Sequence, residues 1–83
     1  MSYELDVDPD ARSQIMALPT HALTSLVDAM AMLELTPWNG DPLHKDNPDG
    51  AVRTLPFGRS GMITYLILDD LRRVDVLNVV WMD

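Results

Sequence analysis

Three β-rich runs with short connections fill the C-terminal part of the chain and restrict its fold more than any other feature. We predict strands at residues 51–57, 62–68 and 73–81, separated by turns at residues 58–61 and 69–72. Connections this short join antiparallel neighbours in hairpins. The middle run is almost wholly apolar, which is typical of a central strand covered on at least one face. The C-terminal part therefore predicts an antiparallel sheet.

The N-terminal part predicts one strand and two helices. Residues 2–7 alternate between apolar and polar side chains, which indicates a half-buried strand. Asp8 and Pro9 suit the N-cap and first position of a short helix that ends before Pro19. Thr20 is the predicted cap of a second helix. The predicted buried stripe of that helix consists of Leu23, Leu26, Val27, Met30 and Leu33.

These elements predict an α+β fold of order β-α-α-β-β-β, with two helices packed on one face of the curved antiparallel sheet. The length favours a single domain spanning residues 1–83. The chain has no cysteine, which excludes disulfides and a thiolate zinc site. No apolar run is long enough to span a membrane, and the acidic N-terminus lacks the apolar segment of a secretory signal. We therefore expect a cytoplasmic protein.

Residues 36–50 hold three prolines and two glycines and are predicted to form a long loop. A loop of this length in a small domain is expected to be ordered over the surface or functional. Trp38 and Leu43 are the side chains expected to hold it down. Ala31 and Met32 make the end of the second helix apolar on its outer side, so either this loop or a partner is expected to cover them.

The net charge of −7 lies entirely in residues 1–50, because nine acids face only two cations there. This acidity works against nonspecific binding to nucleic acid. The arginines of the second half would suffice to hold one phosphate group, and Arg53 and Arg59 are the candidates. The alternatives are a surface arginine paired with an acid for Arg53 and a solvated turn for Arg59. Arg72 and Arg73 are assigned to a charged hairpin tip.

Four other side chains carry groups that could take part in chemistry or in binding a base. His44, next to Lys45 in the loop, is a candidate for proton transfer because histidine titrates near neutrality. The alternative is an exposed loop without a catalytic partner. His21 is expected to face solvent on the polar side of the second helix. Trp81 is expected to pack in the core rather than to stack on a base.

Five stretches, taken in order, resemble the RelE/ParE superfamily, the toxin halves of bacterial toxin–antitoxin pairs. They are the Ala-Leu-Pro break at residues 17–19, the Pro- and Gly-bearing segment at residues 33–43, the arginine-led strand and turn at residues 53–58, the Ile-Thr-Tyr of residues 63–65, and the closing strand at residues 74–79. The resemblance spans nearly the whole chain. The longer loop with its tryptophan resembles the loop of a family branch that is found in actinomycetes.

The resemblance implies a concrete activity. RelE-type members cut mRNA in the ribosomal A site with cationic side chains and without a metal or cofactor, whereas ParE-type members bind DNA gyrase. Both kinds are neutralised by an antitoxin segment that folds over them. Arg53 corresponds to the family's strand arginine and is expected to point into the hollow of the curved sheet. Arg59 lies in a turn where members often carry a basic residue. Asn78, Trp81 and Met82 stand where the family often has a basic strand end and a terminal tyrosine.

The resemblance leads to two hypotheses. The first is a toxin-like component of a type II toxin–antitoxin system, acting as a ribosome-dependent, metal-independent endoribonuclease or as a degenerate relative of one. Its partners would be a cognate antitoxin, the ribosome and mRNA. The alternative is a non-catalytic protein-binding domain on the same scaffold, or a ParE-type gyrase binder. The oligomeric state stays open.

Overall fold

The computed structural model describes residues 2–82, so the end residues Met1 and Asp83 of the predicted domain lie outside the described part of the chain. In chain order the elements are β1 (Glu4–Val7), α1 (Pro9–Met16), α2 (Thr20–Leu35), the 3-10 helix η1 (Pro37–Asn39), β2 (Asp41–Pro42), β3 (Val52–Phe57), β4 (Gly61–Leu68), the 3-10 helix η2 (Asp69–Leu71) and β5 (Arg73–Trp81). The predicted order of helices and long strands is confirmed. No helix in the described residues is long and apolar enough to cross a membrane.

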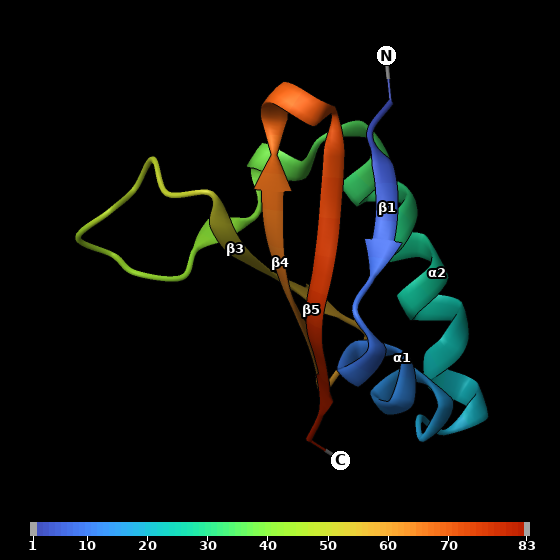
Figure 1. Ribbon diagram of the computed structural model, residues 1–83. Helices are drawn as coiled ribbons and strands as arrows, with labels where there is room; N and C mark the ends of the chain where they lie inside the picture. The colour runs from blue at the N-terminus through green and yellow to red at the C-terminus, as the bar shows by residue number, and fades with distance from the viewer. Residues whose placement is uncertain (1, 83) are drawn as a thin grey trace.

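All strands belong to one sheet with the order β1-β5-β4-β3-β2 (Figure 1). β3, β4 and β5 are antiparallel neighbours, as predicted. β1 pairs with β5 in parallel, and two residues of the predicted loop form the short edge strand β2. The sheet is therefore mixed rather than wholly antiparallel. A parallel pair needs a long connection, and nearly the whole chain lies between β1 and β5.

The core lies between the sheet and the helices. Alternate residues of β4, namely Ile63, Tyr65 and Ile67, are buried, and they stand opposite Val79, Val76 and Val74 of β5. Directly opposed residues of an antiparallel pair share one face of the sheet. Leu26 and Leu33 of α2 belong to the same buried cluster. This face is therefore the helix-covered side, as the sequence predicts for the central strand.

α2 buries a different stripe from the predicted one. Its buried residues are Ala22, Leu26, Ala29 and Leu33. Leu23 and Val27 are instead 38% and 63% exposed. The alanines are small enough for the helix backbone to approach the sheet closely, and this turns the larger residues outward. Leu23, Val27, Ala31 and Leu35, each four residues from the next, form an exposed apolar row that we call the α2 stripe.

α1 closes the part of β5 that β1 leaves unpaired. β1 ends at Val7, so the remaining edge of β5 would expose backbone donors and acceptors. The side chain of Gln14 accepts a hydrogen bond from the Val79 backbone N–H (2.6 Å) and donates one to Asn78 Oδ1 (2.7 Å). Asp8 and Pro9 occupy the N-cap and first position of α1 as predicted, although Asp8 makes no side-chain cap bond. Pro19, rather than the predicted Thr20, occupies the N-cap of α2.

Candidate functional site

Arg53 lies on the helix-covered side of the sheet, which corrects the expectation that it points into an open hollow. It stands directly opposite Tyr65 in the β3–β4 ladder. Tyr65 is fully buried in the core, so the Arg53 side chain leaves the sheet on that same face. Arg53 itself is only 8% exposed. The side chain with the strongest sequence argument for a phosphate contact is therefore largely shielded from solvent.

The guanidinium of Arg53 binds four backbone carbonyls of the segment between α2 and β3. Nη1 donates to the carbonyls of Gly40 (2.8 Å) and Trp38 (3.4 Å), Nη2 to that of Pro48 (2.7 Å), and Nε to that of Gly50 (3.1 Å). The Arg53 group also lies 4.9 Å from the centre of the Trp38 ring, within cation–π distance. The arginine therefore fastens the loop to the sheet, and we call this contact set the Arg53 clamp.

The two side chains predicted to hold the loop are both partly exposed. Trp38 is 38% and Leu43 is 46% exposed. Trp38 contributes through its carbonyl to the Arg53 clamp and through its indole N–H, which donates to Asp69 Oδ1 (3.1 Å). Hydrogen bonds rather than apolar burial therefore hold this segment in place. The reason is that a loop rich in proline and glycine offers carbonyls without many apolar side chains.

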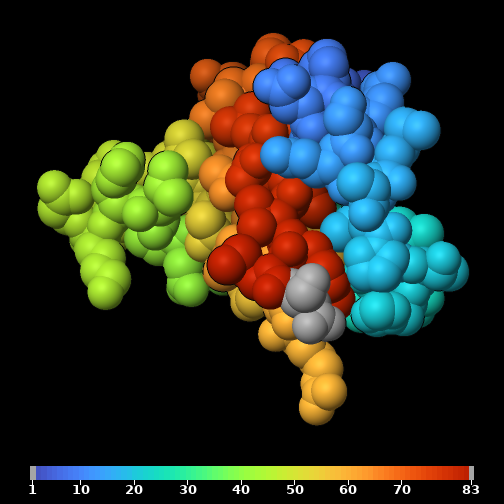
Figure 2. Space-filling model, turned by 90° about the horizontal axis from the view of Figure 1, so that it is seen from below, coloured from blue at the N-terminus to red at the C-terminus, as the bar shows by residue number. Residues whose placement is uncertain are grey.

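His44 and Lys45 lie on the exposed part of the loop, away from the other candidates. Both are exposed, and the His44 carbonyl accepts the Asn47 N–H (3.0 Å) in a local turn. Figure 2 shows the loop and the β3–β4 turn, which carries Arg59, projecting from different parts of the molecule. The four predicted site residues are thus not brought together. The catalytic roles predicted for them stay predictions.

Asp69 is the centre of a second polar cluster at the β4–β5 connection. The Tyr3 hydroxyl donates to Asp69 Oδ1 (2.5 Å), and Arg72 Nη1 donates to the Tyr3 oxygen (3.0 Å). The hydrogen bond from Tyr3, followed by the one from Trp38, holds the pKa of Asp69 below its usual value. The same Tyr3–Asp69 bond raises the pKa of Tyr3. The charged hairpin tip predicted from the sequence is thus linked to Tyr3, directly before β1, and to η1.

Stability is expected to fall in acid because of Asp69. A carboxyl whose pKa is lower in the folded state stabilises the fold above its unfolded pKa of about 3.9, and this contribution is lost as the pH falls through the folded pKa. Urea unfolding measured across the acid range should show this loss, and Asp69→Asn should reduce the dependence on pH. Asp70→Asn, at the neighbouring exposed carboxylate, is the matched control. An unchanged pH profile in Asp69→Asn would contradict the assignment.

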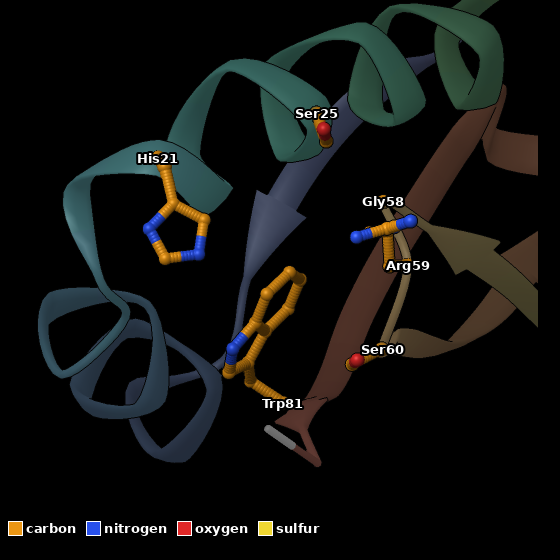
Figure 3. Close-up of a pocket in the computed structure, with 6 residues that line it drawn as sticks. All are labelled: His21, Ser25, Gly58, Arg59, Ser60 and Trp81. Carbon is orange, nitrogen blue, oxygen red and sulfur yellow. The ribbon is translucent and has the colours of Figure 1, made fainter.

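Arg59 lines a cleft of about 580 Å³ between the start of α2, the β3–β4 turn and the end of β5 (Figure 3). The lining residues are His21, Ser25, Gly58, Arg59, Ser60 and Trp81. His21 and Ser25 extend from α2, and the Trp81 indole lies between the helix and the turn. The cleft thus gathers a guanidinium, an imidazole, two hydroxyls and an indole from three segments far apart in sequence.

The turn geometry makes this cleft. Gly58 adopts a left-handed conformation with φ of 59°, which glycine tolerates best. A Cβ atom at this position would lie 3.1 Å from the Trp81 ring. Trp81 packs against Phe57, with ring centroids 5.6 Å apart, and meets His21 edge-on at 5.8 Å. A residue without a side chain therefore allows the indole and the turn to meet.

The sequence predicts an exposed His21 and a packed Trp81, and no local pattern in it connects the two residues. His21 is indeed exposed and Trp81 does pack, but both also line the cleft. The only sequence signal that could have joined them is strand register, because Trp81 pairs with Gly61 directly after the turn. The position of His21 beside them depends on how α2 docks on the sheet, and no local pattern encodes that docking.

Comparison with known proteins establishes the fold. A chain of the toxin–antitoxin complex RelBE2 from Mycobacterium tuberculosis superposes with a TM-score of 0.83 at 23% identity, covering 99% of this chain and 100% of that one. For the intact RelBE complex of E. coli the TM-score is 0.80 at 17% identity, with 98% of each chain covered. The isolated RelE toxin of E. coli gives 0.78 at 17% identity, covering 98% of this chain and 85% of that one.

The sequence itself matches no protein-family model and no curated protein. The likeness is therefore one of fold, and it extends over nearly the full length of both chains in each RelBE comparison. The resemblance to RelE toxins inferred from the sequence is confirmed at the level of the fold.

Proposed function

We propose that the protein is the toxin-like component of a type II toxin–antitoxin pair and acts on translation in the cytoplasm. The observation that carries this proposal is the nearly full-length superposition on chains of two bacterial RelBE complexes and on an isolated RelE toxin. Those proteins are described as toxins or as toxin–antitoxin complexes. A shared fold supports a shared role without fixing the chemistry, which depends on individual side chains.

In this proposal Arg59, rather than Arg53, contacts RNA phosphate. Four carbonyls occupy the guanidinium of Arg53, whereas Arg59 is exposed beside a cleft. RNA cleavage by a 2′-hydroxyl builds negative charge on the phosphate oxygens, and a cation placed beside them stabilises it. The proposed reaction is metal-independent cutting of mRNA on the ribosome. The net charge of −7 disfavours binding to free RNA, so the ribosome would have to present the strand.

The proposed partner is a cognate antitoxin that covers the α2 stripe. Val27 and Leu35 in this row are 63% and 67% exposed, and contiguous exposed apolar rows are typical of interaction surfaces. An amphipathic antitoxin segment with apolar residues at helical spacing would bury them. The comparison proteins from Mycobacterium tuberculosis and E. coli were each solved as a toxin–antitoxin complex.

A second function, that of a non-catalytic protein-binding domain, is favoured by a specific surface. A groove of about 500 Å³ is lined by Trp38, Ala51, Ile67, Leu68, Asp69, Asp70 and Leu71. Its apolar lining and its two carboxylates suit a segment with an apolar anchor and flanking basic residues. In this hypothesis Arg53 has a purely structural task and the protein cuts nothing.

Induced expression in bacteria distinguishes these functions. The toxin proposal predicts growth arrest with an early stop in protein synthesis, relieved by Arg59→Ala but not by Arg12→Ala. Arg12 is a matched control because it is an exposed arginine on α1, outside the cleft. DNA damage without early translational arrest would instead indicate gyrase binding. Normal growth with abundant folded protein would reject the toxin role and favour the binding domain.

A further inference from the structure

We propose that the Arg59 cleft is a binding site for a single nucleotide unit, with the phosphate beside Arg59 and the base against Trp81. The inference rests on the Arg59 phosphate contact of the proposed function and deepens it by naming the ligand, and it does not require that the protein cut RNA. The cleft volume of about 580 Å³ falls within the range of small-molecule sites, about 300–1,000 Å³. Its shape is set by three separate segments, as Figure 3 shows.

The phosphate half of the site consists of the β3–β4 turn and the facing side of α2. Arg59 offers a planar fork of N–H donors that matches two phosphate oxygens at once. Ser60 follows it in the turn, and Ser25 faces the turn from α2, so two hydroxyls line the same cleft. Gly58 has no side chain, which lets Trp81 and Ser25 lie close to the turn and form the cleft wall. Within residues 2–82, Arg59 makes no ion pair that would compete with an anion.

The base half consists of the two aromatic side chains. The Trp81 indole is held in place by Phe57 on one side and meets His21 edge-on, with 70° between the ring planes. Trp81 remains partly exposed and lines the cleft. A fixed and partly exposed indole is a surface on which any nucleobase can stack. The imidazole of His21 adds a hydrogen-bonding group beside that surface.

The phosphate half and the base half together favour a nucleotide over inorganic phosphate or a nucleoside. Inorganic phosphate would use only the arginine and the hydroxyls, and a nucleoside would use only the aromatic rings. A mononucleotide carries at most two negative charges, so the acidic protein repels it less than it repels a long RNA strand. One nucleotide of an RNA strand offers the same phosphate and base as a free mononucleotide. The experiment below distinguishes these two ligands.

Fluorescence can report on the cleft directly. The chain has two tryptophans, so Trp38→Phe leaves Trp81 as the only one. We expect AMP to change Trp81 emission saturably, with an affinity at least about ten-fold higher than that of inorganic phosphate or adenosine. Arg59→Ala in the same background should weaken AMP binding by about ten-fold or more, and Arg12→Ala should leave it unchanged. Calorimetry with the unsubstituted protein repeats the AMP titration without the Trp38 change.

Several results would overturn the inference. These are the absence of saturable AMP binding at millimolar concentrations, equal affinity for phosphate and AMP, and unchanged affinity in Arg59→Ala. A short single-stranded RNA that binds and is displaced by AMP would support the site and identify RNA as one source of the nucleotide unit. RNA binding that AMP cannot displace would reject it. Growth arrest is scored separately, so a toxic protein that binds no AMP would refute this inference and leave the proposed function standing.

Discussion

Replacing Arg53 with alanine is expected to lower the free energy of unfolding by about 3 kcal/mol, because hydrogen bonds to a charged group contribute about 1.5–3 kcal/mol each and cannot all be replaced by water. Four carbonyls lose their donor, and the bond to the Gly40 carbonyl is buried. A domain of this size has only about 4–12 kcal/mol in total. Urea unfolding followed by circular dichroism measures the change, and the midpoint of thermal unfolding should fall by more than about 10 °C.

Two variants test whether the clamp is the cause. Arg53→Lys keeps the charge, but a single ammonium cannot reach carbonyls spread around a planar fork, so it should recover less than half of the lost stability. Arg12→Ala removes an exposed arginine on α1 and should change stability by no more than about 0.5 kcal/mol. An Arg53→Ala protein as stable as the parent would show that the clamp does not hold the loop.

Replacing Gly40 with alanine is expected to destabilise the protein by about 3 kcal/mol, since overpacking and lost buried hydrogen bonds each cost about 1–3 kcal/mol. The new Cβ would overlap the Tyr65 hydroxyl and lie 2.8 Å from the Thr54 carbonyl, which belongs to β3. The strand cannot yield, so η1 would have to move. That movement would break the Tyr65 bond to the Pro37 carbonyl (2.7 Å) and the Arg53 bond to Gly40.

Gly50→Ala is the matched control for this substitution. Gly50 belongs to the same loop and also gives its carbonyl to Arg53, but an added Cβ would approach only Asn47 in the exposed part of the loop. We expect a loss of no more than about 1 kcal/mol there. Because Gly40 and Arg53 share one contact set, the double variant should lose less than the sum of the two single changes. Additive losses would contradict the coupling.

The sequence predicted the elements well because their signals are local. Alternation in residues 2–7, the helix start at Pro9, the helix end before Pro19, and the short turns after residues 57 and 68 each depend on neighbouring residues. The parallel pairing of β1 and the two-residue strand β2 depend on partners far along the chain. The buried stripe of α2 was predicted from the helical spacing of its larger apolar residues, whereas in the structure two alanines in the buried stripe allow close packing.

The candidate site was predicted less well, for a related reason. An arginine that begins a strand has the same local pattern whether it points to solvent or clamps a loop. The partners of Arg53 are backbone carbonyls, which carry no sequence signature. Arg59 was found because a charged residue in a glycine-flanked turn is exposed. The approach of His21 and Trp81 to it arises only when α2 docks on the sheet.

The position of Arg53 affects how growth experiments are interpreted. An Arg53 variant that loses toxicity would be explained by a disordered loop and an unstable fold, without any role in chemistry. Loss of toxicity therefore indicates an RNA contact only for a variant whose unfolding free energy is unchanged. An Arg59 variant is expected to meet that condition, because Arg59 lies on an exposed turn and its side chain makes no hydrogen bond or ion pair within residues 2–82.

The most direct test of the toxin role is a bacterial cell-free translation reaction that receives the purified, folded protein. We expect reporter synthesis to fall as the protein is added and the reporter mRNA to be cut only while ribosomes translate it. The Arg59→Ala protein should inhibit reporter synthesis at least about ten-fold more weakly than the unsubstituted protein. The Arg12→Ala protein should inhibit as strongly as the unsubstituted protein. Undiminished synthesis with intact mRNA, at protein concentrations above that of the ribosomes, would contradict the toxin role.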